Sequence, residues 1–576
     1  MQNRIVCFFI EQMRLICVFI VMVLFLTQNI LSQEYTDLRL VLDSQKGKSL
    51  INIPKGRYFL DIDKGVHYTF NNMKNVTVEG NGSVIICKKQ SRAFDIKNCE
   101  NFTLQNITID YDPLCFTQGT LDAISDDGRK WEVTLHEGYP VENIYHSKIQ
   151  FFDPKTMDLK ENFYTMHNSD YTFEQSKENL RKLTLTIKRN IPKGVVNVGE
   201  YIVFPIMVKN MAQHCIVMES NINQVLKNVT IYGSNMFSIV EHDCDNTHFL
   251  NCTITRNPTD NSKSIRRLRS GNGDGIHSKH AVKGPTIDGC RVEFNADDNI
   301  AINGRFYPVY KIDKDKKEIF ILSRDGAVFQ VEPTDEIVVV NNSGPIRGMS
   351  KVLSKKNDVA SKADLDSCFA KFTIKLQSQE NLKYAACIKL DSWVDNLSVG
   401  DLVYSSNRTG NNFIVRNNFV GHTRARGILI KASNGIIENN TIEGTQLAAI
   451  ALSPEFNWLE AGCSNNIVVR NNSIRNCMHA STHPGMTQPG VITVITINAS
   501  GKVSEAGASN NITITNNTID HCPKPYVVAT STTNLTISEN KFSNEDILVR
   551  KHGTSLGVDP NQPIWVRNVE NYIFIP

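Results

Sequence analysis

Seven five-residue phrases between residues 250 and 542 repeat one pattern, and this repeat constrains the fold more than any other feature. The phrases are LNCTI, DGCRV, RNNFV, ENNTI, RNNSI, TNNTI and SENKF. Their third positions are Cys252, Cys290, Asn418, Asn440, Asn472, Asn517 and Asn540. Two spacings, 440 − 418 = 22 and 540 − 517 = 23, correspond to single coils of a parallel β-helix. Asn side chains that stack and hydrogen-bond along a turn explain such a repeat. The pattern predicts an all-β chain built on a right-handed parallel β-helix.

Earlier segments show the same rhythm of strand and turn. Residues 75–87 (NVTVEGNGSVIIC) and 93–112 (AFDIKNCENFTLQNITIDYD) alternate apolar with polar residues and then turn on Asn or Gly. Before them, DLRLVLDS predicts a short helix and RYFLDI a first strand, which would cover the open end of the β-helix. Residues 33–115 are therefore interpreted as an N-terminal cap followed by the first coils. The Asn-x-Thr tripeptides fit turns followed by strands better than glycosylation sites.

The coil rhythm stops twice. In residues 116–207, WEVTLHEGYPV, SKIQFFDP, KLTLTIKR and VGEYIVFPI indicate strands of an antiparallel unit. In residues 305–406, VYKIDKDKKEIFILS, DEIVVVNN, KFTIKLQ and VGDLVYSS do the same. Both segments end on a Val-Gly-acidic phrase and return directly to coils. We interpret them as two inserted antiparallel β-barrel domains, with central coils at 208–304 and C-terminal coils at 407–576.

The N-terminus predicts export. Arg14 precedes the apolar run LICVFIVMVLFL, which suits a secretory signal peptide over residues 1–32, with Met1 or Met13 as the start. The run is short for a membrane span, so we expect a periplasmic or extracellular protein of bacterial type, with no stable membrane insertion after cleavage. The net charge of +3 comes without basic blocks, which argues against a nucleic-acid partner.

The cysteines do not form a metal-binding or disulfide pattern. Twelve of the 14 cysteines follow residue 32, and Cys252 and Cys290 occupy the repeat position that Asn fills elsewhere. Most are therefore expected to be buried ladder residues rather than disulfide partners. The sequence contains no CxxC, no HExxH and no acidic calcium loop, so it predicts no metal and no cofactor.

The stretch Gly271 to Gly304 contains the candidate catalytic residues. The segments DGIHS, beginning at Asp274, and DNIAI, beginning at Asp298, match each other at an interval of 298 − 274 = 24 residues, the length of one coil. Strands on adjacent coils pair about 4.8 Å apart, so Asp274 would lie above Asp297 and Asp298. Clustered carboxylates raise one another's pKa, which costs stability but suits an acid and a base in glycoside hydrolysis. The alternative for Asp274 is a structural turn cap.

Several phrases resemble known carbohydrate enzymes. NGDG followed by ADDN is similar to the pectin-lyase-like glycosidases, although their basic RIK phrase has only a loose counterpart in RARGILIK. The combination of DGIHSKHA, the paired aspartates, RARGIL, IALSPEFNWLEAG and two inserted barrels more closely resembles glycoside hydrolase family 110. That resemblance implies a metal-independent, inverting exo-α-1,3-galactosidase acting on blood-group-B or linear α-galactosyl glycans. It also implies that Asp274 is the general acid and that Asp297 and Asp298 activate water.

The arrangement of adjacent coils also predicts the distance between these carboxyls. Inverting enzymes hold their carboxyls about 6.5–9.5 Å apart to admit water, and side chains that diverge from adjacent coils would reach that separation. Paired aspartates also suit water activation, since neighbouring cations can hold one of them ionised.

Seven further residues are candidates for substrate binding. His277, Lys279 and His280 follow Asp274 along its strand, and Asn303 takes the matching place one coil later. Arg426 shares the column of the aspartates, and Trp458 and Glu460 lie in the loop after IALSPEF. Outward strand positions and a cation beside an aspartate suit contact with sugar oxygens, and aromatic rings pack on sugar C–H faces. Each also has a structural interpretation, as a solvated strand face, an ion pair or a loop anchor.

Three alternatives to the galactosidase hypothesis stay open at this point. A polygalacturonase-like hydrolase would use the same aspartates on an acidic glycan. A polysaccharide lyase or epimerase would use the paired aspartates to bind calcium and would need an acidic sugar. A non-catalytic carbohydrate-binding β-helix would bind oligosaccharides without turnover.

Overall fold

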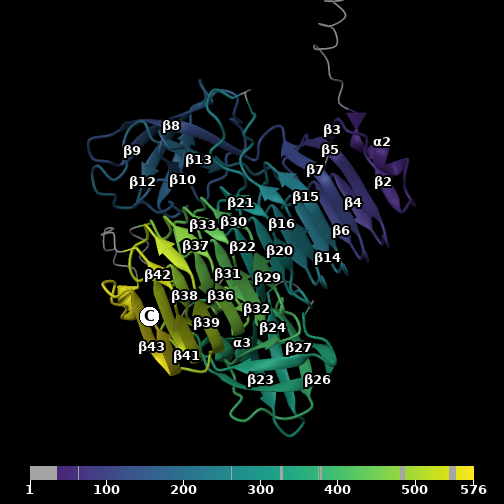
Figure 1. Ribbon diagram of the computed structural model, residues 1–576, viewed down its shortest axis with the longest axis vertical. Coiled ribbons are helices and arrows are strands. Elements are labelled where there is room, and N and C mark those ends of the chain that lie inside the picture. Colours follow the sequence, from purple (N-terminus) through teal and green to yellow (C-terminus); the bar gives the residue numbers. More distant parts are fainter. Residues whose placement is uncertain are drawn as a thin grey trace, which may run out of the picture.

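The computed structural model describes residues 36–62, 64–260, 263–324, 329–373, 375–376, 379–480, 487–543 and 553–576, and it confirms the predicted fold class. Thirty-one strands form one continuous sheet that coils into a parallel β-helix. Figure 1 shows the coils stacked from the purple N-terminal end to the yellow C-terminal end, with the two antiparallel insertions on opposite sides of the central and later coils. The predicted signal peptide lies outside the described residues.

Parallel strands line three faces of the β-helix, and the first face carries the aspartates. Its strands pair in the order β4 (Tyr68–Asn71), β6 (Phe94–Lys97), β14 (Ile216–Glu219), β16 (Ile239–His242), β19 (Ile276–Lys279), β22 (Ile300–Arg305), β31 (Ile428–Lys431), β34 (Ile450–Leu452), β38 (Ile492–Val494), β41 (Val527–Ser538) and β43 (Ile564–Ile575). Period-two alternation places Ile276, Ile300 and Ile428, which are aligned across neighbouring strands, in the core.

The other two faces use shorter strands and the remaining parts of the long ones. One runs through β1 (Thr36–Asp37), β3 (Arg57–Leu60), β5 (Thr77–Cys87), β7 (Thr103–Tyr111), β15 (Val225–Ile231), β18 (Thr253–Ile254), β21 (Arg291–Glu293), β30 (Phe419–Gly421), β33 (Thr441–Glu443), β37 (Ser473–Arg475), β40 (Thr518–Asp520) and β42 (Lys541–Phe542). The other includes β2 (Leu50–Asn52), β17 (His248–Leu250), β20 (Thr286–Asp288), β29 (Ile414–Arg416), β32 (Gly435–Glu438), β36 (Asn465–Arg470) and β39 (Ser509–Thr515).

The repeated phrases form a buried ladder between two of these faces. The Asn440 side-chain oxygen accepts a hydrogen bond from the Asn418 backbone N–H at 3.0 Å, and the Asn472 oxygen accepts from Asn440 at 3.0 Å. The ladder continues through Asn517 to Asn540 and reaches back to Cys290. Each rung pairs polar groups that the turn would otherwise bury without partners. The predicted coil repeat is confirmed.

The N-terminal cap also follows the prediction. Helix α2 (Leu38–Asp43) is capped by the Asp37 side chain, which accepts from the Arg39 backbone N–H at 3.0 Å. Leu38 and Leu42 of this helix are buried at the end of the core. The other helices are α3 (Lys362–Phe369), η1 (Gln379–Asn381) and η2 (Thr554–Leu556). Within the described ranges, no helix has the length and apolar character needed to cross a bilayer.

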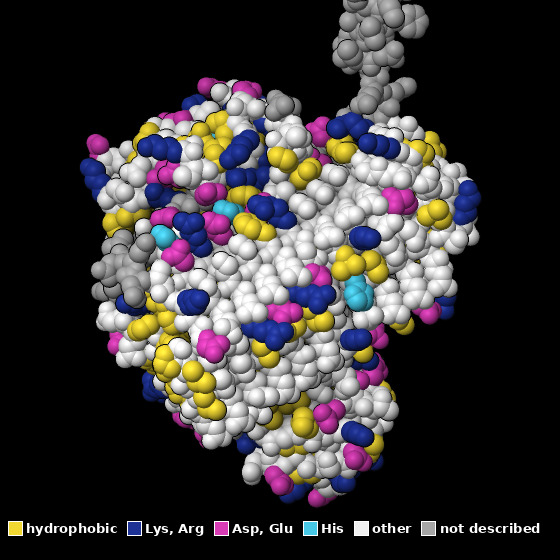
Figure 2. Space-filling model, in the orientation of Figure 1, with side chains coloured by type: hydrophobic (Ala, Val, Ile, Leu, Met, Phe, Trp, Pro, Cys, Tyr) yellow, Lys and Arg dark blue, Asp and Glu magenta, His cyan; other side chains and the backbone are white. Residues whose placement is uncertain are grey.

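The first insertion is a six-stranded antiparallel sheet on the side of the β-helix. Its strands are β8 (Phe116–Ile124), β9 (Lys130–Leu135), β10 (Gln150–Phe152), β11 (Tyr171–Gln175), β12 (Lys182–Ile187) and β13 (Tyr201–Pro205), in the order β10-β13-β8-β9-β12-β11. The sheet does not close into the barrel predicted from the sequence, because its end strands β10 and β11 do not pair. These strands surround a core of their own. Charged side chains and histidines gather along the border between this insertion and the coils (Figure 2). One such contact pairs His422 with Asp158 at 3.5 Å.

The second insertion is a closed antiparallel barrel. Its strands are β23 (Tyr307–Asp313), β24 (Glu318–Ser323), β25 (Glu336–Val340), β26 (Ile346–Asp358), β27 (Tyr384–Leu390) and β28 (Leu402–Ser405). It leaves the β-helix directly after β22, the strand that follows the paired aspartates. Strand β35 (Glu460–Ala461) returns to this exit point and pairs antiparallel with Gly304 and Arg305. The loop before β35 is thereby held next to the aspartate-bearing face.

Candidate active site

The three aspartates lie at the turns that lead into β19 and β22. Ile276 is aligned with Ile300, so Asp274 occupies the same place on its coil as Asp298 does on the next, as the 24-residue interval predicts. The Gly275 backbone N–H donates to the Asp298 carbonyl at 2.9 Å. A Cβ at Gly275 would lie 2.5 Å from the Asn299 carbonyl oxygen, which explains why glycine follows Asp274. The buried Asn299 fixes the lower turn by donating to Gly421 O at 2.8 Å.

The three carboxyls converge. One side-chain oxygen from each of Asp274, Asp297 and Asp298 lies within 4.8 Å of the others. These nearest oxygens are closer together than the separation of about 6.5–9.5 Å expected between the carboxyl groups.

Asp297 is held by two cations that come from different parts of the chain. Lys148, from the first insertion, donates to Asp297 Oδ2, and Arg424 donates to Asp297 Oδ1. Arg424 also donates to the Tyr164 hydroxyl, which belongs to the same insertion. The insertion thus supplies two side chains to the candidate site.

Asp298 begins a chain of alternating charges. Arg426 donates its backbone N–H to Asp298 Oδ1 at 2.9 Å, and its Nε lies 3.0 Å from the same oxygen. Its Nη2 lies 3.5 Å from Glu455, which accepts a 2.6 Å bond from Lys431. Lys431 also donates to Glu460. Each buried charge in this chain has an opposite partner, which offsets its desolvation.

These surroundings separate the pKa values of the three carboxyls. Burial, with repulsion from Asp297, raises the pKa of Asp274 to about 8. Burial also raises the pKa of Asp298 to about 7, although Arg426 opposes the shift. Burial alone would raise the pKa of Asp297, but Arg424 and Lys148 outweigh it and hold that pKa below its usual range. The site therefore combines a carboxyl that stays protonated at neutral pH with one that stays ionised.

His277 and Asn303 were proposed from the sequence as sugar-binding residues, and in the structure His277 contacts both Asp274 and Asn303. His277 Nδ1 lies 2.6 Å from Asp274 Oδ2, and its Nε2 lies 2.6 Å from Asn303 Oδ1. Their exposed fractions are 4% and 1%. Their polar atoms are therefore engaged within the protein rather than presented to a ligand.

Besides Arg426, described above, four further sequence candidates have different surroundings. Burial lowers the pKa of Lys279, whose Nζ lies 5.4 Å from the centre of the Phe237 ring. His280 is buried at the turn after β19, and its ring centre is 6.2 Å from that of His242. Glu460 is bound by Lys431, as described above. Trp458 is 43% exposed in the loop before β35, so its ring is accessible to a ligand.

Sequence reasoning missed five residues of this network. They are Lys148, Tyr164, Arg424, Lys431 and Glu455. Arg424 and Lys431 could have been found, because they lie in the same RARGILIK phrase as Arg426. Glu455 lies in the phrase that also contains Trp458 and Glu460. Lys148 and Tyr164 gave no signal, because nothing in the sequence indicates how the first insertion packs against the coils.

The aspartate cluster has the composition of a metal site, but its charges are already matched. Oxygens from three carboxyls within 4.8 Å of one another could hold a divalent ion. Two cations already bind Asp297, and Arg426 binds Asp298. A divalent ion would have to displace these partners, so the donor set does not fit a resident metal.

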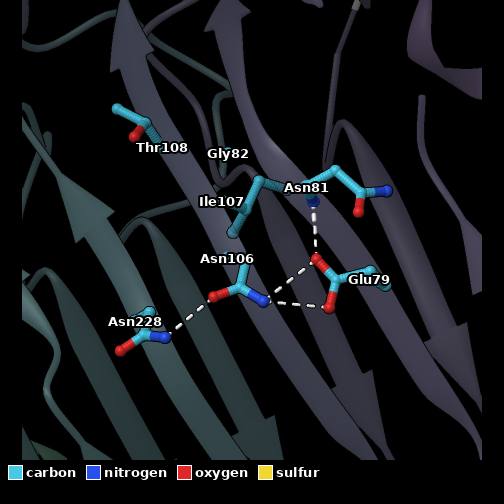
Figure 3. Close-up of a pocket in the computed structure, with 7 residues that line it drawn as sticks. All are labelled: Glu79, Asn81, Gly82, Asn106, Ile107, Thr108 and Asn228. Atoms are coloured by element: carbon cyan, nitrogen blue, oxygen red, sulfur yellow. Dashed lines mark hydrogen bonds between the residues drawn. The ribbon is translucent and has the colours of Figure 1, made fainter. Parts of the chain in front are cut away.

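A polar hollow on the N-terminal coils is separate from this site. It has a volume of 390 Å³ and is lined by Glu79, Asn81, Gly82, Asn106, Ile107, Thr108 and Asn228 (Figure 3). The Glu79 carboxylate accepts hydrogen bonds from the Asn106 side chain and the Asn81 backbone N–H. Its oxygens are therefore satisfied by the protein itself, and none of the candidate residues lines the hollow.

Comparisons with known proteins agree with the fold and add a chemical context. A family model described as a right-handed β-helix region matches residues 374–542. An α-1,3-galactosidase B from Bacteroides thetaiotaomicron is 23% identical over 472 residues, covering 76% of this chain and 71% of the relative. An α-1,3-galactosidase A from Shewanella woodyi is 22% identical over 476 residues, covering 75% and 71%.

Two solved structures align with most of this chain. The A-module of a mannuronan C-5 epimerase from Azotobacter vinelandii has 10% identity and a TM-score of 0.38, with 94% of this chain and 96% of that one covered. The catalytic domain of a GH87 α-1,3-glucanase in complex with nigerose has 10% identity and a TM-score of 0.39, with 94% and 65% covered.

Proposed function

We propose that this protein is an exported exo-glycosidase that hydrolyses terminal α-1,3-linked galactose. One observation carries the reaction class: three carboxyls lie within 4.8 Å, and their surroundings keep one protonated and another ionised. The names of the galactosidase relatives support the sugar and the linkage. The apolar run after Arg14 supports export.

In the proposed reaction, Asp274 is the acid. Its proton passes to the glycosidic oxygen while the bond from that oxygen to the anomeric carbon breaks. Water attacks the anomeric carbon and gives a proton to Asp298. A carboxylate with a pKa of about 7 is a stronger base than Asp297, whose pKa is held low. Asp297 keeps its negative charge, orients the water and stabilises the cationic transition state.

The proposed substrate contacts follow from exposure and charge. Trp458 is exposed enough to pack on the C–H face of a galactose ring. Arg426 and Glu460, together with Lys279, lie in the charged network next to the aspartates and would bond sugar hydroxyls. His277, Asn303 and His280 are not included among these contacts, because their side chains are buried.

The decisive experiment is hydrolysis of Galα1-3Gal and of the branched B trisaccharide in EDTA, followed by proton NMR. Release of galactose supports both the reaction and the linkage. β-Galactose as the first product supports inversion, which the family resemblance implies. α-Galactose first would assign a retaining mechanism, for which carboxyls about 5–5.5 Å apart are typical.

A negative result in this experiment would direct the search to another class of substrate. If neither galactoside is cleaved, the galactosidase proposal is wrong. Uronic-acid polymers with calcium are then the next substrates, because the aspartate cluster could hold a cation if its arginine and lysine partners moved. An unsaturated product that absorbs ultraviolet light would identify a lyase.

A further inference from the structure

The hydrogen bonds around Asp274 indicate where the proton of the Asp274–His277 pair lies. The Asn303 side-chain amide donates through Nδ2 to the Gly304 carbonyl at 2.8 Å, which fixes the orientation of that amide. Its oxygen therefore faces His277 Nε2 at 2.6 Å. An amide oxygen only accepts hydrogen bonds, so Nε2 carries a hydrogen.

The second ring nitrogen of His277 then determines the protonation state of Asp274. His277 Nδ1 lies 2.6 Å from Asp274 Oδ2. In a neutral ring with hydrogen on Nε2, Nδ1 is a bare acceptor. Two acceptors do not approach to 2.6 Å without a proton between them, so the Asp274–His277 pair holds one proton in this contact. The pair is then neutral overall.

The surroundings favour the neutral form of each partner. Burial, and then the Lys279 cation, lower the pKa of His277 to about 3. The ring is stacked on Phe237, with a centre-to-centre distance of 5.1 Å, which keeps water away from one face. The charged groups that face Asp274 include Asp297, Asp298 and Glu460, and the cations Lys279 and Lys148. The proton therefore lies on the carboxyl oxygen and not on the imidazole.

We propose that His277 and Asn303 are positioning residues that keep Asp274 protonated at neutral pH. Asn303 fixes the ring tautomer, and the bare Nδ1 destabilises the ionised carboxylate. This inference rests on the proposed function in one respect only, namely that the stored proton is the one given to the leaving oxygen. It gives His277 a different role from sugar binding.

A first test needs no substrate. The infrared difference spectrum between the wild type and Asp274→Asn at pH 7 is expected to show the carbonyl band of a protonated carboxyl, lost in the variant. The band should disappear as the pH rises through about 8. A difference spectrum with only ionised carboxylate bands would overturn the proposal. Because this readout is independent of turnover, it decides the proposal even if the galactosides are not cleaved.

A second test uses kinetics. In His277→Asn the amide can turn its N–H₂ group toward Asp274, and in Asn303→Leu the ring is free to place hydrogen on Nδ1. Both changes offer a donor to the carboxylate, so the alkaline limb of the kcat/KM profile should move to lower pH by at least one unit, about tenfold in proton concentration. Phe237→Leu alters the packing of the ring without touching its hydrogen bonds and is the control. Loss of activity with an unmoved limb in both variants would show a merely structural role.

Discussion

The three aspartates show how identical residues acquire different chemistry from their neighbours. Asp297 has two cations within bonding distance, Asp298 has one, and Asp274 has a neutral imidazole. Asp274 and Asp298 are buried and Asp297 is partly buried, and burial raises a carboxyl pKa unless a cation compensates. The order of their pKa values therefore follows the number of cationic partners.

Isosteric removal of each carboxylate is expected to abolish most of the activity. Asp274→Asn, Asp297→Asn and Asp298→Asn should each lower kcat at least about a hundredfold, the usual contribution of a general acid or base. Thermal unfolding should stay cooperative in all three, because Asn keeps the size and most of the hydrogen bonds. Near-native turnover in any one variant would remove that residue from the mechanism.

The pH dependence of kcat/KM should be a narrow bell. Activity needs Asp298 ionised and Asp274 protonated. It is therefore lost as pH falls below about 7, where Asp298 binds a proton, and as pH rises above about 8, where Asp274 loses one. Because the two groups interact, the limbs report the pair rather than either residue alone. A broad plateau from pH 4 to pH 7 would contradict the assignment of Asp298 as the base.

At the scale of elements, the first insertion contributes Lys148 to the site as well as the Tyr164 hydroxyl. Lys148→Met should raise the pKa of Asp297 and lower kcat about tenfold or more, since Arg424 remains as a cation. Lys182→Met, at an exposed position on β12 of the same insertion, is the matched control and should leave kcat unchanged. Steady-state kinetics of both variants provide the measurement. Equal effects of the two substitutions would show that the insertion acts only through its overall stability.

The Asn ladder predicts a large stability difference between neighbouring residues. Asn440→Ala leaves the Asn418 backbone N–H without its partner and removes one donor from the Val415 carbonyl. It should cost at least about 2 kcal/mol, because a buried group left unpaired costs about 1–3 kcal/mol. Thr441→Ala, at an exposed position on β33, should cost less than about 0.5 kcal/mol. Chemical denaturation measures both, and similar losses would contradict the role of the ladder.

The elements that the sequence predicts best are those built from local repeats. The coils could be predicted because each repeats the same turn, whose buried Asn must pair with its neighbour. The alignment of Asp274 with Asp298 followed from the same register. The partners of Asp297 could not be predicted, since Lys148 is 149 residues away in sequence and is brought near only by packing of the insertion.

At the scale of the whole molecule, the cysteines are the unusual feature. All twelve cysteines of the described residues are free and buried. Alkylation of the native protein followed by mass spectrometry should leave these twelve unmodified, whereas alkylation in denaturant should modify them all. Reductant should leave the unfolding temperature unchanged. A mass lower by two hydrogens per cysteine pair in the unreduced protein would reveal a disulfide and contradict this structure.

The long separation between the partners of Asp297 sets an order of events during synthesis. Lys148 leaves the ribosome before the aspartate, while Arg424 follows it by 127 residues. A nascent chain that ends between Asp298 and Arg424 possesses all three carboxyls. It lacks Arg424, Arg426 and the loop with Glu460. Such a fragment has too few positive charges to neutralise the cluster, so its central coils stay hydrated until the later coils stack on them. The aspartate cluster is thus completed only by cations from the chain's C-terminal third.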